Sequence, residues 1–186
     1  EQALEFGKKA IALDDSNPYA HATLVSVYGF LKEHDKAISE AEKAVSLDPN
    51  SATAYGALGN VLTWVGRPQE AIPFFKKSLR LSPIPIDSGT LNRLGHAYRQ
   101  LGQYEEAVAT LKKALQLYGA DHLTAHLFLA TAYTYMGREK EARAEAAEVM
   151  RIDPKFSLES YARRVPFKDQ KATDDYVSAL RKAGLK

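Results

Sequence analysis

Two histidines four residues apart, His122 and His126, come nearest to the spacing of a reactive site. On a helix this spacing places both imidazoles on one face, an arrangement that can bind a metal ion. A complete metal site needs further ligands, and no third candidate stands near these two. The chain has no cysteine, which removes thiolate metal sites, disulfides and thiol catalysis. We therefore predict no metal ion and no cofactor.

The acidic and glycine residues give no better case for catalysis. Glu105 and Glu106 stand at the expected start of a helix, where carboxylates complement the helix dipole. The sequence contains no phosphate-binding glycine loop, nucleophile elbow or zinc-protease motif. Gly59 and Gly66 are explained better by a repeat than by a phosphate loop. We predict no catalytic residues and no enzymatic activity in these residues, while a catalytic domain further upstream stays open.

The composition indicates a folded chain with no charge-based preference for a polyanion. Its 186 residues are 45% hydrophobic and 26% charged, and the net charge is +2. A balance this close to neutral gives no reason to expect nucleic acid as a partner. No apolar run approaches the ~20 residues of a membrane span. We predict a cytoplasmic protein that binds neither nucleic acid nor membrane, and the initial Glu1 suggests an excised piece of a longer protein.

The elements that position these residues are set by an internal repeat of about 34 to 36 residues. Leu24 aligns with Leu58, and Ala37 aligns with Ala71. Each unit shows apolar residues at helical spacing, a break, and a second helical run. We expect repeats at 18–51, 52–87, 88–122 and 123–156, each of two amphipathic helices. Residues 1–17 match only the second helix of a truncated repeat.

The repeated residues resemble the tetratricopeptide repeat (TPR) family. The residues that match its pattern in the second and third units are Tyr55, Leu58, Gly59, Gly66, Ala71, Phe75, Pro83, Leu91, Leu94, Gly95, Tyr98, Gly102, Tyr104, Ala107 and Ala114. Lys32 departs from the pattern because it replaces the turn glycine of the first unit. The resemblance implies an all-α, right-handed α-solenoid of tandem TPR helix-turn-helix repeats with C-terminal capping helices.

The resemblance also implies a concave groove lined by the first helix of each repeat, whose inward residues contact a ligand. Carried onto this chain, the partner-binding positions are Tyr19, Ser26, Phe30, Asn60, Thr63, Trp64, Asn92, His96, Arg99, Gln100, Leu127, Thr131 and Tyr135. Of the set that grips chaperone carboxylates in this family only Asn60 agrees, so we reject that specificity. The polar and modestly basic centre suits a peptide with some acidic character.

Trp64, the only tryptophan, shares a groove column with Phe30 and Tyr135. Two roles stay open for these aromatic side chains. They form an apolar track for a peptide, since interface hot spots favour tryptophan and tyrosine. Alternatively, they pack half-buried against the first helix of the next repeat.

Residues 157–186 fall outside the repeat. Ser157 and Asp169 can cap two helices, and the second would carry Tyr176, Val177 and Leu180 on one face. We expect these helices to cover the apolar face of the last repeat. This tail also resembles the segment that closes the repeat region of bacterial class III adenylate cyclase-like proteins.

The leading prediction is a non-catalytic protein–protein interaction module that binds a peptide or partner protein in its groove. The alternative is a regulatory or oligomerising C-terminal region of a larger bacterial signalling enzyme, adenylate cyclase-like in type. A third hypothesis is self-association through residues 1–14, whose apolar face lacks a first helix to pack on.

Overall fold

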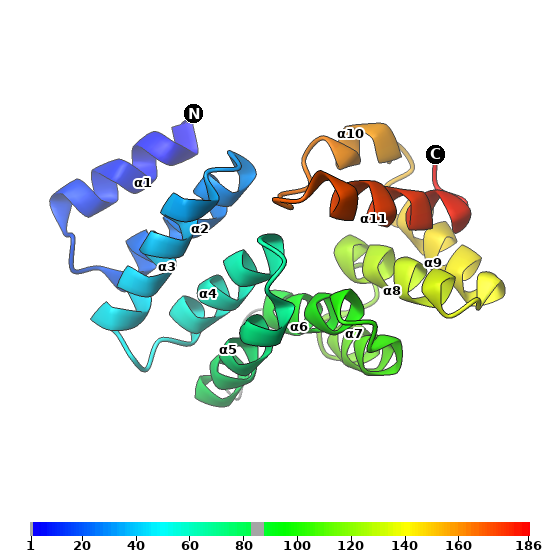
Figure 1. Ribbon diagram of the computed structural model, residues 1–186, viewed down its shortest axis with the longest axis horizontal. Helices are drawn as coiled ribbons and strands as arrows, with labels where there is room; N and C mark the ends of the chain where they lie inside the picture. The colour runs from blue at the N-terminus through cyan, green and yellow to red at the C-terminus, as the bar shows by residue number, and fades with distance from the viewer. Residues whose placement is uncertain (1, 83–87) are drawn as a thin grey trace. The chain divides into compact units, whose positions relative to one another are not determined.

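The computed structural model describes residues 2–82 and 88–186, and helices with short turns account for nearly all of them (Figure 1). The helices are α1 (Gln2–Leu13), α2 (Pro18–Phe30), α3 (His34–Leu47), α4 (Ala52–Trp64), α5 (Pro68–Leu81), α6 (Ser88–Gln100), α7 (Tyr104–Tyr118), α8 (Leu123–Tyr135), α9 (Glu139–Ile152), α10 (Leu158–Ala162) and α11 (Gln170–Lys182). Over the described ranges there is no strand. The predicted fold class, an all-α stack of tandem helix pairs followed by C-terminal helices, is confirmed.

Local sequence signals explain where several helices begin. The side chains of Asn17 and Ser51 accept hydrogen bonds from the first backbone N–H groups of α2 and α4. In the C-terminal segment the side chains of Ser157 and Asp169 cap α10 and α11, as predicted. Pro68 occupies the first turn of α5, where its missing N–H removes no helical hydrogen bond.

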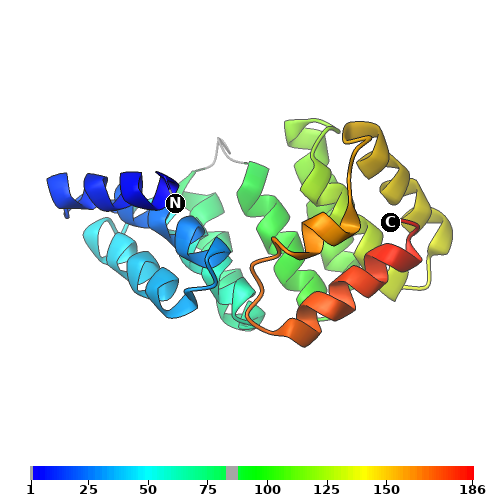
Figure 2. The ribbon, with the colours of Figure 1, turned by 90° about the horizontal axis from the view of Figure 1, so that it is seen from above.

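The chain forms two compact units. The first contains α1 to α5 together with residues 166–168, and the second contains α6 to α11. In the first unit α2 pairs with α3 and α4 with α5, while α4 also packs on α2 and α3, and α1 on α2. In the second unit α6 pairs with α7 and α8 with α9, and α8 also contacts α6, α7 and α11 (Figure 2).

Glycines bring the two helices into close contact in the pairs α4/α5 and α6/α7. A Cβ atom added at Gly59 would lie 2.8 Å from the ring of Phe75, and one at Gly95 would lie 2.6 Å from Leu111. Either contact is too short for a real side chain, so glycine is required by packing at both positions.

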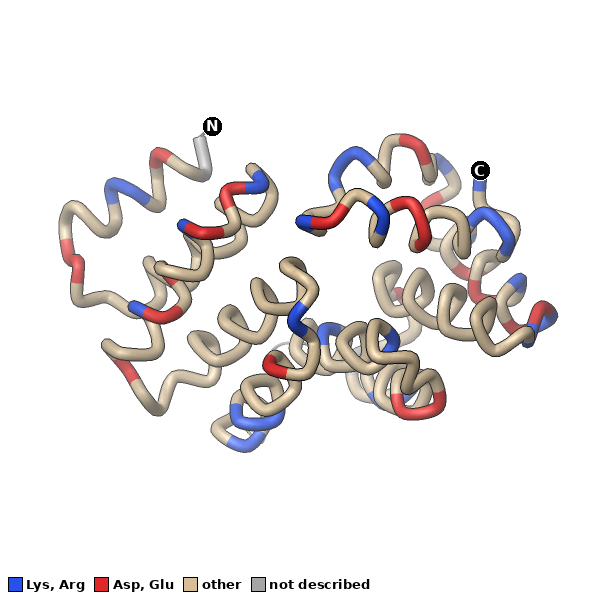
Figure 3. The backbone as a smooth tube through the Cα atoms, viewed as in Figure 1, with Lys and Arg blue, Asp and Glu red and all other residues tan. Residues whose placement is uncertain are grey.

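Charged residues avoid the first helices of three repeats. Helices α2, α4 and α8 contain no lysine, arginine, aspartate or glutamate, whereas α3, α5, α7 and α9 carry many (Figure 3). The first helices therefore offer apolar and neutral polar side chains to whatever covers them. None of the helices in the described part of the chain is both long enough and apolar enough to cross a membrane.

Candidate partner-binding surface

Trp64 is a packing residue of the first unit. It is only 8% exposed, and its ring lies against α2, where a Cβ added at Gly29 would be 2.0 Å from Trp64 Cζ3. Its ring centroid is 6.2 Å from that of Phe30. The backbone N–H of Lys168 donates to the Trp64 carbonyl at 2.8 Å, which places residues 166–168 beside the end of α4. Trp64 thus packs on the preceding repeat, whereas the packing alternative drawn from the sequence named the next one.

Other predicted groove residues of the first unit divide between the interior and the surface. Asn60 and Thr63 are buried on α4, and the Thr63 hydroxyl donates to the Gly59 carbonyl at 2.8 Å. On α2, by contrast, Tyr19 is 61% exposed and Phe30 is 63% exposed. Tyr19, Ser26 and Phe30 lie on one face of α2, because intervals of seven and eleven residues bring a helix back to nearly the same direction.

In the second unit the predicted groove positions lie mostly in the interior. Asn92, His96, Leu127 and Thr131 are all buried. Helix α11 packs against α8, and the ring of its Tyr176 lies 6.3 Å from that of His96 on α6. Helix α11 thus packs on the last repeat, where the sequence placed the cap, and its Tyr176 also reaches His96 and Arg99 on α6 of the preceding repeat. A partner would reach His96 and Arg99 only after α11 is displaced.

Arg99 is a buried cation held by aromatic side chains. It is 7% exposed, and its guanidinium carbon lies 4.9 Å from the ring centroid of Tyr176. No acidic side chain is paired with it among the described residues, and its Nε has no hydrogen-bond partner there. Burial lowers the pKa of Arg99, and Tyr176 and Tyr135 offset part of that effect. An arginine remains charged under these conditions, so this face keeps one uncompensated positive charge.

Neutral hydrogen bonds also hold α11 on α8. The Tyr135 hydroxyl donates to the Asp175 carbonyl at 3.2 Å, and the Thr134 hydroxyl lies 3.3 Å from the Ala179 carbonyl. Tyr135 also stacks on Tyr104 with ring centroids 5.5 Å apart. A pocket of about 390 Å³ runs along the outer edge of this contact. Gln100, another predicted groove residue, is partly buried on α6.

The two histidines with metal-like spacing have other partners. His126 Nδ1 lies 2.6 Å from Glu145 and its Nε2 2.7 Å from the Ala120 carbonyl, so both ring nitrogens are occupied. The Asn92 amide contacts His122 at 2.9 Å. His21 repeats the His126 arrangement with Glu40 in the first repeat. Over the residues that the structure describes, no group of three or more metal-binding side chains comes together.

Sequence reasoning did not include Tyr176 or Phe128 among the site residues. The ring of Phe128 stacks on His96 with centroids 4.3 Å apart, and burial lowers the pKa of His96 well below its ordinary value. Tyr176 was placed on an apolar helix face, but the helical period gave no information on which repeat this face would contact. In the sequence, the absence of charged residues from α8 was the signal that another element covers this helix.

Comparison with family models places the chain in a family. Three models described as tetratricopeptide repeats match residues 18–51, 51–82 and 87–155. Together they cover well over half of the chain, so it belongs to the tetratricopeptide repeat family. A sequence search of curated proteins gives no match.

Several solved structures are similar to the chain. PilW, a type IV pilus biogenesis factor, has a TM-score of 0.76 at 22% identity, over 98% of this chain and 80% of its own. A thermophilic TPR protein of Thermus thermophilus has a TM-score of 0.72 at 24% identity, over 96% and 89%. YrrB, described as a TPR protein with an unusual peptide-binding site, has a TM-score of 0.60 at 24% identity, over 95% and 90%. These likenesses show the fold.

Proposed function

We propose that the protein is a non-catalytic interaction module, and that a peptide or partner protein binds the exposed face of α2. The observation that carries this proposal is the exposure of Tyr19 and Phe30 on one side of a helix without charged residues. Large aromatic side chains supply much of the energy of protein interfaces, and most isolated chains keep them at least partly covered. Membership of the TPR family, and a similar structure described as peptide-binding, support the same class of function.

The exposed ring of Phe30 has an aromatic neighbour in the core of the first unit. Its centroid lies 6.2 Å from that of Trp64, whose ring packs against Gly29. A contact made before binding reduces the conformational entropy that the side chain loses when a partner arrives. Neighbouring α1 adds Phe6 and Leu13, both exposed and seven residues apart on one face. Helix α1, which packs on α2, thus carries exposed apolar side chains of its own.

The second unit illustrates how a first-helix face of this protein accepts a helix. Helix α11 lies on α8, inserts Tyr176 beside His96 and Phe128, and places that ring over Arg99. This is groove docking of an amphipathic helix. An external partner of the second unit has to displace α11, and the uncompensated charge of Arg99 favours a partner with acidic character. The predicted groove residues of α6 and α8 would contact a partner only in this second binding mode, in which α11 is displaced.

Selection from a peptide library tests whether a peptide binds the exposed face of α2. Peptides selected on the immobilised protein would be titrated in solution, with Trp64 fluorescence as the reporter because its ring is near Phe30. We expect Phe30→Ser to weaken binding at least about tenfold, as for an interface hot spot.

Leu117→Ser is the matched control. Leu117 is also a large exposed apolar residue, but it lies on α7 of the second unit. We expect this variant to bind the selected peptides as the unchanged protein does. Peptides that bind Phe30→Ser with unchanged affinity would contradict the α2 surface as the site.

Two finer hypotheses from the sequence remain proposals. A cyclase-like enzyme would carry its catalytic domain upstream of Glu1, which the coding sequence there would reveal. Self-association through residues 1–14 finds support in the exposure of Phe6 and Leu13. Light scattering over a range of concentrations tests it, and a constant monomer mass would remove it.

A further inference from the structure

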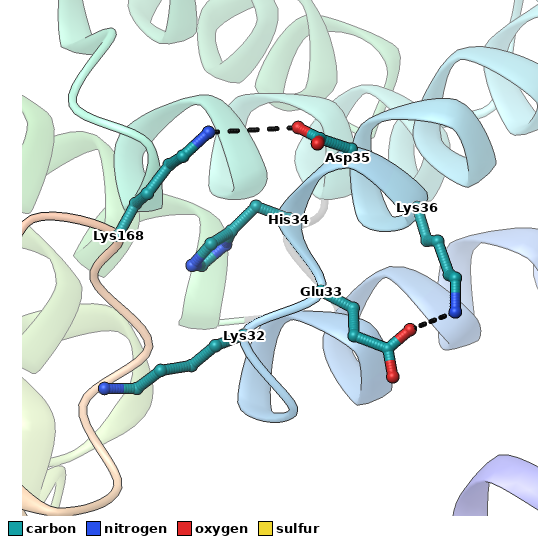
Figure 4. A pocket seen from close by; sticks show the side chains of 6 residues that line it. All are labelled: Lys32, Glu33, His34, Asp35, Lys36 and Lys168. Atoms are coloured by element: carbon teal, nitrogen blue, oxygen red, sulfur yellow. Dashed lines mark hydrogen bonds and ion pairs between the residues drawn. The ribbon is translucent and has the colours of Figure 1, made fainter.

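A pocket in the first unit shares no lining residue with the α2 surface or with the predicted partner-binding positions. It has a volume of about 410 Å³ and is lined by the turn between α2 and α3, by the first turn of α3, and by Lys168 (Figure 4). Its lining residues are Lys32, Glu33, His34, Asp35, Lys36 and Lys168. Five of these six side chains carry a formal charge, so the pocket is polar.

His34 is a buried polar side chain whose ring nitrogens are both unpaired. It is 5% exposed, and within the described ranges neither Nδ1 nor Nε2 has a hydrogen-bond partner. Its imidazole points into the pocket, between the side chains of Lys32 and Lys168 (Figure 4). Buried polar groups are nearly always hydrogen-bonded, because leaving one unpaired costs the free energy of its desolvation. An unpaired ring that faces a pocket indicates a ligand with a hydrogen-bonding atom.

The charges around His34 favour an anion. Lys36 pairs with Glu33, and Lys168 lies 3.8 Å from Asp35 across a largely exposed contact. Lys32 pairs with no carboxylate of the described residues, so three lysines against two carboxylates leave the pocket positive. Burial and the Lys168 ammonium lower the pKa of His34, which indicates that the imidazole is neutral and able to donate one N–H.

The start of α3 adds donors to the same pocket. The first N–H groups of a helix have no intrahelical acceptor, and the cap residue Glu33 makes no side-chain hydrogen bond to them. Helix N-termini of this kind bind phosphate groups through these N–H groups and the helix dipole. His34 itself begins α3, so its ring and the first backbone N–H groups lie at one end of one helix.

Lys32 occupies its place at a conformational cost. Its φ of 59° is in the left-handed region, whereas the matching turns of the other repeats use Gly66, Gly102 and Gly137. A lysine is disfavoured there, so this turn carries its side chain at a cost that glycine would avoid.

We propose that this pocket binds a phosphoryl group, with the His34 ring and the first turn of α3 donating hydrogen bonds and Lys32 and Lys168 supplying the charge. The chemistry is non-covalent recognition of a dianionic oxyanion. Tetrahedral phosphate oxygens can accept from a ring N–H, from backbone N–H groups and from ammonium groups at the same time.

The test is an NMR titration of the histidine ring signals with inorganic phosphate at constant ionic strength. The protein has five histidines, and each is assigned by substitution. We expect a saturable shift confined to His34, and a rise in its pKa because a bound dianion offsets the neighbouring lysines. The charged groups that line the pocket with the ring are Lys32, Glu33, Asp35, Lys36 and Lys168, and the same titration is repeated at several pH values.

Substitution of single lysines distinguishes a specific phosphate site from nonspecific electrostatic attraction. We expect Lys32→Ala and Lys168→Ala each to weaken phosphate binding about tenfold or more, as for a charge-assisted hydrogen bond. Lys43→Ala removes the same charge from an exposed position further along α3 and should leave affinity unchanged. A linear, unsaturated shift, or an equal loss in all three variants, would overturn the proposal.

Two further ligands identify the source of the phosphoryl group. A short phosphoserine peptide that binds at least about tenfold more tightly than phosphate would indicate a phosphorylated partner, because added contacts raise affinity. Equal or weaker binding of the peptide would indicate free phosphate or a small phosphate ester. A response to acetate as strong as the response to phosphate would overturn the assignment to a phosphoryl group.

Discussion

The ring of Trp64 fills the space that a side chain at position 29 would occupy, since a Cβ added at Gly29 would lie 2.0 Å from Trp64 Cζ3. This contact joins α4 to α2 and supports the exposed ring of Phe30. It links the core of the first unit to its proposed binding surface. Disturbing it should affect stability first and partner binding as a consequence.

Gly29→Ala should destabilise the protein by about 1–3 kcal/mol, because the whole indole ring has to move to admit the methyl group. Urea unfolding gives the free energy, and a red shift of Trp64 emission would report greater exposure of the ring. Thr23→Ala is the control on the same helix, at an exposed position, and should stay within about 0.5 kcal/mol of the unchanged protein. Unchanged stability of Gly29→Ala would show that α2 and α4 can separate freely.

Tyr176→Ala should destabilise the second unit by about 3–5 kcal/mol, the range for truncating a fully buried aromatic side chain. The loss removes the ring over Arg99 and leaves the guanidinium buried without that contact. Hydrogen exchange should then be faster in α6 and α8 than in α2 and α4. Tyr176→Phe retains the ring and removes the hydroxyl that contacts Tyr161, so it should cost about 1 kcal/mol.

Tyr19→Ala makes the same substitution at an exposed tyrosine and serves as the comparison for Tyr176→Ala. Because Tyr19 is largely exposed, we expect a change within about 0.5 kcal/mol. If Tyr176→Ala were as mild as Tyr19→Ala, α11 would contribute little to the second unit.

The fold was predictable from the sequence because the signals for it are local. Helical spacing of apolar residues, capping residues such as Ser157 and Asp169, and glycines at turns and close contacts each act within one repeat or between neighbours. The division into two units was not predictable. Every repeat carries the same local signals, and these do not report how strongly successive repeats contact one another.

The candidate sites were harder to predict because they depend on contacts between distant segments. Tyr176 meets Arg99, and Lys168 meets Asp35, across long stretches of chain. The family pattern places His96 and Arg99 on an inner face but cannot show that α11 covers it. Lys32 was recognised as a departure from the turn glycine, while its relation to His34 and Lys168 required the fold.

Lys32→Gly should both stabilise the first unit and weaken phosphate binding about tenfold or more, as expected for Lys32→Ala. Glycine adopts a φ of 59° without strain, and the gain, reduced by the entropy of glycine in the unfolded chain, is about 0.5–1 kcal/mol. Thermal unfolding measures the first effect and the His34 titration measures the second. A phosphate affinity that is unchanged in this variant would exclude Lys32 from the pocket's function.

The pair His126–Glu145 should make stability fall as pH rises above neutrality. Burial disfavours the charged form of His126, but hydrogen bonds to Glu145 and to the Ala120 carbonyl outweigh it, and the pKa of His126 is raised. The folded protein therefore holds this proton to higher pH than the unfolded chain does. The resulting stabilisation is complete below about pH 6.5 and is lost as pH rises through the folded pKa. Each tenfold difference in proton affinity between the folded and the unfolded chain corresponds to about 1.4 kcal/mol.

Urea unfolding at pH 6 and pH 9 checks this sign with Glu145→Gln, which keeps the size of the side chain and removes its charge. We expect the free-energy difference between the unchanged protein and Glu145→Gln to be larger at pH 6 than at pH 9. Glu141→Gln serves as the control on the same helix, since Glu141 pairs with Arg138 and neither group titrates in this interval. A difference for Glu145→Gln that does not change with pH would mean that His126 is uncharged in the folded protein, and that its contact with Glu145 is only a neutral hydrogen bond.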